Sequence, residues 1–189
     1  LLSLNKAQSV LKEIPEPQLA DIFKKIDVSF FLDLLISSPV DEAAFFLSCL
    51  PEEEQKKRLE QIDSPLRGKI LQFLNYPEDS AGRIMQTKVF RLPDRLTARE
   101  GLETLRSKAQ EESIYYIYCV DKNNRLTGII SLRELATAPA DEPLKNIIKK
   151  EVVTVKPESS SEDVARIVAH YDFIAIPVVD ENQTLLGII

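Results

Sequence analysis

The chain has few of the residues that build disulfides, metal centres and glycine-rich phosphate loops. Its 189 residues include two cysteines, one histidine and five glycines. Cys49 and Cys119 lie far apart and outside any CxxC pair, so we expect neither a disulfide framework nor a zinc site. We predict instead two reduced, half-buried core cysteines in a cytosolic protein. The sequence also has no P-loop and no GxGxxG pattern, which argues against a glycine-rich phosphate cradle.

A catalytic constellation is missing as well. His170 has no neighbouring Ser or Cys nucleophile and belongs to no HExxH motif. It stands near the end of an expected helix, where a cation suits the helix dipole. We therefore predict that the protein is not an enzyme.

Long apolar runs are also absent, since no stretch approaches the roughly 20 residues that a membrane span needs. The start, LLSLNKAQSV, is amphipathic rather than a signal peptide, and it reads as part of a longer chain. Residues 1–80 carry 14 acids against 9 bases, whereas residues 81–189 carry 16 against 15. This acidic first part argues against nucleic acid as a partner and favours cations.

The most informative feature that is present is an internal repeat. The segment VDKNNRLTGII (120–130) returns 59 positions later as VDENQTLLGII (179–189), with seven identical letters. Each copy reads as a strand, an Asp-rich turn and a second strand containing a glycine, which is typical of a hairpin. Upstream, residues 89–105 and 152–168 each read as a short strand, a turn marked by proline and a capped helix. Two copies of one small βα unit are therefore expected.

The first part of the chain reads as helix throughout. Pro39, Pro51 and Pro65 recur at intervals of 12 to 14 residues, and we expect each in the first turn of a helix. Short apolar-periodic segments flank them: 19–26, 29–36, 42–50, 55–62 and 69–74. Helices this short must stack on neighbours to bury their apolar faces. We predict an all-helical, superhelical (solenoid-like) domain over residues 1–79, bounded by the turn-forming run NYPEDSAG.

The second part alternates strands and helices. Strands are expected at 114–121, 126–131, 152–155, 173–180 and 185–189, and helices at 131–138 and 161–172. Thr97 with Glu100, and Ser160 with Asp163, stand where capping boxes would begin the long helix of each repeat. We predict a first repeat over residues 80–139 and a second over 140–189, incomplete at its carboxyl end. The fold class is α + α/β.

These segments carry a family resemblance. The βαββα pair with GIISLRE resembles a tandem CBS module, and the runs YPEDSAGRIM, IYYIYCVD and EDVARIVAHYDFIAIPVVD resemble the cytosolic region of the MgtE family of magnesium channels. The resemblance implies a region on the cytoplasmic face of the plasma membrane, attached to a transmembrane pore. It also implies a homodimer formed through the CBS domains, Mg²⁺ as ligand, and closure of the pore when Mg²⁺ docks the helical domain on the CBS pair.

Candidate Mg²⁺ ligands follow mainly from this resemblance. Mg²⁺ keeps several waters and takes one or two carboxylates, so such sites leave no compact motif. Ser160 stands where the family has an acid. First-turn acids also complement the helix dipole, and linker acids also favour turns, so structural roles remain open for all but Asp172. The candidates are Glu162, Asp172, Asp41, Glu42, Glu78 and Asp79.

An adenine nucleotide, ATP or another, is the second ligand that the resemblance implies. In CBS modules an aromatic or apolar patch holds the base, and a Ser/Thr-x-x-Asp motif reaches the ribose. Here Ser131 and Glu134 take that motif, with Glu in place of Asp. The candidate cleft wall consists of Tyr116, Arg133, Phe173 and Pro177. Aromatic residues of strands also serve packing, so a cleft without ligand is the alternative.

A second function stays open at this stage. The helical domain could dock a partner protein while the CBS pair dimerises or senses a nucleotide, which would make the chain an interaction adaptor. The two functions differ in whether the full-length gene continues past Ile189 into about five apolar spans.

Overall fold

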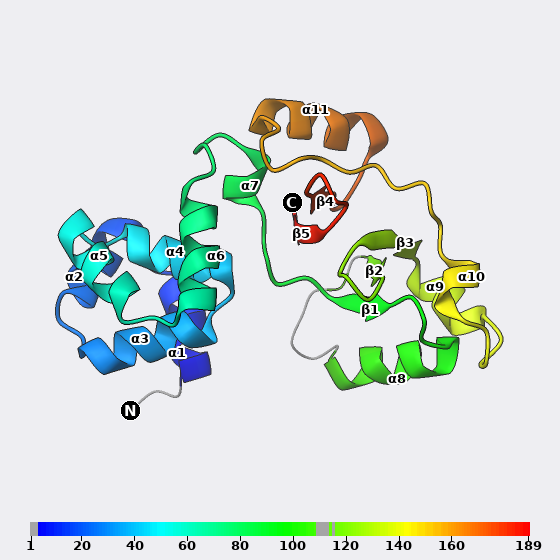
Figure 1. Ribbon diagram of the computed structural model, residues 1–189, viewed down its shortest axis with the longest axis horizontal. Helices are drawn as coiled ribbons and strands as arrows, with labels where there is room; N and C mark the ends of the chain where they lie inside the picture. Colours follow the sequence, from blue (N-terminus) through cyan, green and yellow to red (C-terminus); the bar gives the residue numbers. More distant parts are fainter. Residues whose placement is uncertain (1–3, 109–113, 115) are drawn as a thin grey trace. The chain divides into compact units, whose positions relative to one another are not determined.

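The computed structural model describes residues 4–108, 114 and 116–189 (Figure 1). Leu1–Ser3 of the amphipathic start and Tyr115 of the predicted strand 114–121 lie outside the described residues. The chain divides into two compact units between Tyr76 and Pro77. In the described ranges no helix combines the length and hydropathy that a bilayer crossing requires.

The first unit is helical, as predicted. Its helices are α1 (Leu4–Lys12), α2 (Glu16–Phe23), α3 (Val28–Ser37), α4 (Val40–Ser48), α5 (Glu52–Glu60) and α6 (Ser64–Leu74). Pro39 and Pro51 occupy N-cap positions, one residue earlier than predicted, whereas Pro65 lies in the first turn of α6. At all three positions the missing N–H costs no helical hydrogen bond.

The core of this unit gathers around α4, which packs against α3, α5 and α6. Phe23 lies between two other buried rings, with centroids 5.0 Å from Phe31 and 5.5 Å from Phe46, both edge-on. Such pairs add to the burial of apolar area that holds short helices together.

The second unit contains both repeats. The first repeat contains α7 (Ala81–Ile84), β1 (Arg91–Pro93), α8 (Ala98–Lys108), β2 (Ile117–Val120), β3 (Leu126–Ile130) and α9 (Leu132–Thr137), and α10 (Leu144–Ile147) begins the second. Strand β1 pairs in parallel with β2, which pairs antiparallel with β3. Thr97 and Glu100 form the predicted reciprocal capping bonds before α8.

The second repeat contributes α11 (Ser161–Tyr171) and the antiparallel pair β4 (Pro177–Val179) and β5 (Leu185–Ile188). The predicted strand at 152–155 is wrong, because only Val155 forms a bridge, in parallel with Val178. Pro157 follows two residues later and has no N–H with which to extend the ladder. Ser160 caps α11 by accepting from the Asp163 N–H.

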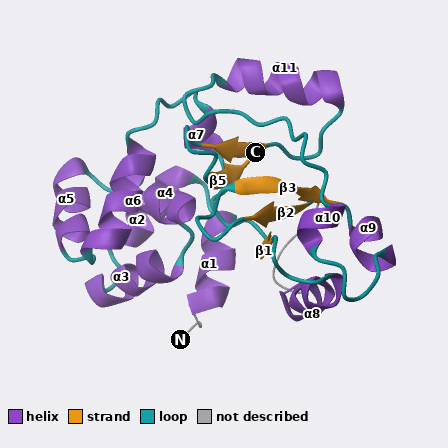
Figure 2. Cartoon of the chain, turned by 45° about the vertical axis from the view of Figure 1, so that its right-hand side comes forward, coloured by secondary structure: helices purple, strands orange, loops and turns teal. Residues whose placement is uncertain are grey.

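Strand β2 separates two cores, since its side chains alternate between the faces of the sheet. Ile117 and Cys119 pack toward α8, α9 and α10, while Tyr118 and Val120 pack against Val179 and Leu185 of the second repeat. Figure 2 shows β2 between β1 and β3. The cysteines are therefore not half-buried as predicted: Cys119 is fully buried and Cys49 nearly so, and both are free.

The two repeats are joined by backbone hydrogen bonds. Leu126 N–H donates to the carbonyl of Gln183, and Leu185 N–H donates to that of Asn124, so the two hairpin turns interlock. At the other side Ala81 N–H donates to the Ser159 carbonyl, which fastens α7 to the residues that precede α11. The repeats thus form one body with a cleft between them.

Candidate functional site

The cleft has a volume of about 540 Å³ and is bordered by both repeats. Its lining comes from three segments: strands β2 and β3 with the residue before them, the connection that follows α10, and the chain from the end of α11 into β4. The lining residues are Tyr116, Tyr118, Ile129, Lys149, Glu151, Val152, Val153, Tyr171, Phe173, Ala175 and Pro177.

Aromatic rings form two walls of this cleft. On the first repeat, the rings of Tyr116 and Tyr118 meet edge to face with centroids 6.5 Å apart. On the second, Tyr171 and Phe173 stack at 5.2 Å with their planes 15° apart. The first pair shares a face because the residues stand two apart along an extended chain. Flat apolar surfaces of this kind suit a planar ring between them.

Tyr118 lines the cleft but carries a fully buried hydroxyl. Tyr118 is 2% exposed, and its hydroxyl has no hydrogen-bond partner among the described residues. Burial raises the pKa of Tyr118, so the group stays a neutral donor and acceptor. Burying a hydroxyl without a partner is unfavourable, so this group lowers the stability of the folded chain.

Two charged side chains border the cleft. The backbone of Lys149 exchanges two hydrogen bonds with that of Ile129, at 2.8 and 3.0 Å, which fixes this connection against β3. Gly128 permits the approach, since a Cβ there would lie 2.5 Å from the Lys149 carbonyl oxygen. Glu151 follows two residues later on the same connection. The lining thus carries one ammonium and one carboxylate.

The predicted ribose motif lies at the start of α9 and is not part of the lining. Ser131 and Glu134 form a full capping box there: Glu134 Oε2 accepts from the Ser131 N–H at 2.8 Å and from its hydroxyl at 2.7 Å. The Ser131 hydroxyl and N–H lower the pKa of Glu134, with a smaller contribution from Lys149. Arg133 is exposed beside them.

The predicted nucleotide residues are thus brought together only in part. Tyr116, Phe173 and Pro177 border the cleft, whereas Ser131, Arg133 and Glu134 do not. Sequence reasoning missed Tyr118 and Tyr171, although the period-2 pattern of the strand could have paired Tyr118 with Tyr116. It also missed Lys149 and Glu151, which stand in a connection that has no motif.

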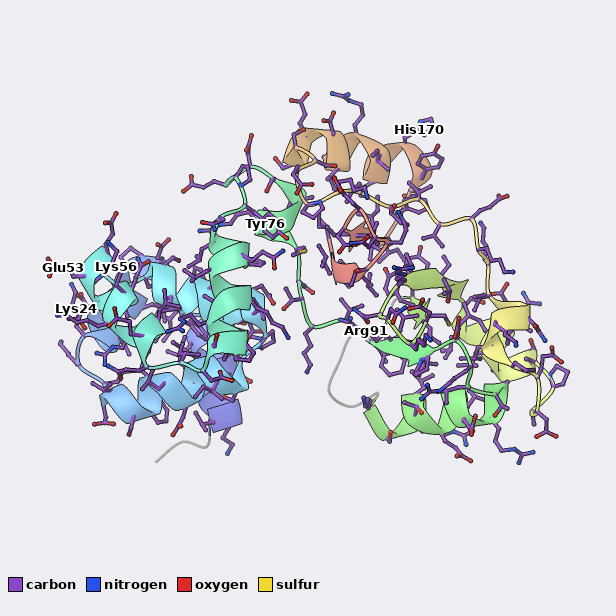
Figure 3. All side chains as sticks on the ribbon, viewed as in Figure 1. Lys24, Glu53, Lys56, Tyr76, Arg91 and His170 are labelled. Atoms are coloured by element: carbon purple, nitrogen blue, oxygen red, sulfur yellow. The ribbon has the colours of Figure 1, made fainter. Side chains whose placement is uncertain are left out.

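The candidate metal ligands of the second repeat are exposed. The Glu162 carboxylate lies 3.2 Å from the Arg166 guanidinium one turn along α11. Asp172 ends this helix in the left-handed conformation, with φ 53° and ψ 42°, which an Asp tolerates better than most residues. His170, in the last turn as predicted, packs edge-on against Tyr171 (Figure 3).

The remaining candidate acids have separate surroundings. Glu42 Oε1 lies 2.5 Å from Lys12 Nζ, and Asp41 precedes it in the first turn of α4. Glu78 and Asp79 are exposed, and the Asp79 carbonyl accepts from the Ser161 N–H at 2.6 Å. Within the described part of the chain, no three His, Cys, Asp or Glu side chains gather as a metal site would need.

Comparison with known families divides the chain in the same order. Residues 1–79 match the MgtE intracellular N domain, and residues 81–141 and 144–189 match the CBS domain. The magnesium transporter MgtE of Thermus thermophilus is 34% identical over the whole chain, which spans 43% of that protein. The magnesium transporter MgtE of Bacillus subtilis is 37% identical over 61% of the chain and is covered over 26% of its own length.

Two solved structures resemble the whole chain. One is the cytosolic domain of the Mg²⁺ channel MgtE in complex with ATP, with a TM-score of 0.83 and 33% identity; the chain covers 78% of it. The other is the soluble part of a magnesium transporter, with a TM-score of 0.73 and 31% identity, of which 79% is covered. The chain therefore spans less than half of these two transporters but more than three quarters of each solved structure.

Proposed function

The chain belongs to the MgtE family of magnesium transporters, as an N domain followed by a CBS pair, and we propose that it gates an attached magnesium channel in response to Mg²⁺. The observation that carries this proposal is the match of the whole chain to the cytosolic domain of a Mg²⁺ channel. This family consists of transporters, in agreement with the prediction that the chain is not an enzyme.

The gating step that we propose is electrostatic. Carboxylates on the helical domain and on the CBS pair repel one another when Mg²⁺ is scarce, and Mg²⁺ bridges them when it is abundant. Since Mg²⁺ keeps most of its waters, exposed acids such as Glu162 and Asp172 suit it without a preformed cage. Glu42 enters such a site only if Mg²⁺ competes with Lys12 for its carboxylate. Asp41, Glu78 and Asp79 are further candidates.

Several weak sites are enough for this step. A millimolar dissociation constant corresponds to only about 4 kcal/mol of binding free energy, but several such sites that act together shift a conformational equilibrium steeply. The proposed partners are an attached transmembrane pore and a second copy of this chain, bound through the CBS domains.

The cleft supplies a second input, an adenine nucleotide. Two aromatic walls favour a planar heterocycle as the ligand. The related MgtE cytosolic domain is known in complex with ATP. Nucleotide binding would stiffen the contact between the repeats, because the ligand touches both.

Thermal unfolding in MgCl₂ tests the Mg²⁺ proposal. At ten times a millimolar dissociation constant, one site stabilises the folded chain by roughly 1.4 kcal/mol, which raises Tm by about 3 °C. We expect this rise in Tm in about 10 to 20 mM MgCl₂, which is at least ten times a millimolar dissociation constant. We expect no such rise in NaCl of matched ionic strength.

Charge-removing variants locate the sites. Glu162→Gln with Asp172→Asn should reduce the rise by half or more, and Asn preserves the left-handed position at 172. Glu53→Gln is the matched control, because Glu53 is another exposed first-turn acid and lies on the surface of the helical unit (Figure 3). An equal Tm in both salts would contradict the proposal and favour the adaptor function.

A further inference from the structure

We propose that the helical domain acts on the CBS pair through the second repeat, because the chain that leaves this domain is fastened to α11 and β5. The attached stretch, called the junction segment below, comprises residues 79–86. It opens the first repeat in sequence but bonds to the second. The inference rests on the proposed gating function and adds the route by which movement of the helical domain reaches the CBS pair.

The start of the junction segment is bonded to the first residues of α11. Ser161 N–H, which has no partner inside its own helix, donates to the Asp79 carbonyl at 2.6 Å. Ser80 forms an antiparallel bridge with Ser160 and is 1% exposed. The next two N–H groups of the segment donate to the residues before α11: Ala81 to the Ser159 carbonyl and Gly82 to the Pro157 carbonyl. Helix α7 therefore lies against α11 (Figure 1).

The end of the junction segment joins the hairpin of the second repeat. Gln86 and Ile188 of β5 exchange two backbone hydrogen bonds, at 2.8 and 3.0 Å. Gly187 permits this approach, because a Cβ there would lie 2.6 Å from the Gln86 carbonyl oxygen and 2.9 Å from the Met85 sulfur. Met85 is 5% exposed, so the segment is packed into the second repeat as well as bonded to it.

The first repeat shows the same arrangement in exchange. Ile129 of β3 exchanges two backbone hydrogen bonds with Lys149, which belongs to the opening of the second repeat. Ile129 and Ile188 are 59 positions apart, which is the spacing of the internal repeat. Each hairpin thus bonds to the opening segment of the other repeat. Sequence order alone would assign the junction to the first repeat, and the hydrogen bonds assign it to the second.

This attachment ties the junction segment to a candidate Mg²⁺ ligand. Glu162 directly follows Ser161, whose N–H is bonded to the Asp79 carbonyl. Displacing the segment would leave these backbone groups without partners, which is unfavourable. The segment and the first turn of α11 are therefore expected to move together, so that a change in the helical domain reaches Glu162 through bonded backbone.

Amide hydrogen exchange of the chain, followed by NMR with and without about 20 mM MgCl₂, tests the proposal. In the wild type we expect MgCl₂ to slow exchange at Gln86 and Ser161 by about threefold or more, because docking of the helical domain holds the junction segment in place. Exchange at Lys149, in the equivalent contact of the first repeat, should change by less than that. NaCl of matched ionic strength should leave all three rates unchanged.

Gly187→Ala loosens the junction segment, and Gly128→Ala is its matched control. The first substitution places a Cβ against the Gln86 carbonyl, so exchange at Gln86 should accelerate by about tenfold or more, and the Mg²⁺ effect at Ser161 should fall by half or more. The second places a Cβ against the Lys149 carbonyl in the same way. It should accelerate exchange at Lys149 and preserve the Mg²⁺ effect at Ser161.

The contrary outcomes are distinct. Equal slowing at Lys149 and Ser161 in the wild type, or slowing at Lys149 alone, would overturn the route through the second repeat even if Gly187→Ala failed to fold. A full Mg²⁺ effect in Gly187→Ala would overturn it too. If MgCl₂ raised Tm but changed no exchange rate in the junction segment, the route alone would fall. If it changed neither, the gating function would fall with it.

Discussion

Tyr118 belongs both to the core between the repeats and to the lining of the cleft. Its hydroxyl is buried without a partner among the described residues. An unpaired buried hydroxyl lowers the stability of the chain. The residue thus affects the stability of the core and also lines the cleft.

The Tyr118→Phe variant separates these two effects. We expect the ligand-free variant to be more stable by about 1 kcal/mol, because the unsatisfied hydroxyl is gone while the ring remains. Its affinity for an adenine nucleotide should stay unchanged, because the buried hydroxyl is out of a ligand's reach; calorimetry and urea unfolding measure the two quantities. Tyr116→Phe is the control for stability, since Tyr116 is only half-buried. A less stable Tyr118→Phe chain would show that the hydroxyl has a partner after all.

The sequence identified candidate residues for the nucleotide site, but it did not show which of them border the same cleft. Tyr116, Phe173 and Pro177 were predicted from the resemblance to CBS modules, and they do border the cleft. Lys149 and Glu151 could not, since their position depends on a connection that only the folded repeats bring against β3. Ser131 and Glu134 were recognised as a motif, but the same spacing also makes a capping box, and that is what they form.

Among the elements, β3 sets the geometry of the cleft through one glycine. Gly128 stands opposite Cys119 of β2, and its missing side chain lets the Lys149 carbonyl come close from the other edge. The connection that carries Lys149 and Glu151 therefore depends on this position. A methyl group there would push the connection outward.

Gly128→Ala tests this dependence. The new Cβ would lie 2.5 Å from the Lys149 carbonyl oxygen, which is backbone and cannot rotate away. We expect a loss of about 1 to 3 kcal/mol in the free energy of unfolding, with weaker nucleotide binding. Gly68→Ala is the opposite control, because nothing lies within 4 Å of that position in α6 and alanine favours helix; it should stabilise by about 0.5 to 1 kcal/mol. A Gly128→Ala chain as stable as the wild type would refute the contact with the Lys149 carbonyl.

Helices and strands could be predicted from the sequence where the apolar period extended over several residues. The helices of the first unit and the hairpin of each repeat were predicted from apolar period and turn residues. The strand at 152–155 failed, because a parallel ladder through Val155 would continue with an N–H from Pro157 on one side and from Pro177 of β4 on the other, and proline has none. Pairing is a property of two segments, and a single segment does not show it.

For the whole molecule, the repeat and the proline-marked helices were enough to identify two kinds of domain. Spacing alone does not predict the acids that we propose as Mg²⁺ ligands, because a hydrated ion needs only scattered carboxylates. We propose that Mg²⁺ changes how the N domain and the CBS pair engage, which is a property of the chain as a whole rather than of one site.

Limited proteolysis at the junction of the two units tests this claim most directly. Glu78 is exposed one residue after Pro77, where the units divide, so a protease specific for glutamate can cleave there. We predict that cleavage after Glu78 slows severalfold between 0 and about 20 mM MgCl₂, with a millimolar midpoint, and does not slow in NaCl of matched ionic strength. Equal cleavage rates in the two salts would contradict Mg²⁺-dependent engagement of the domains.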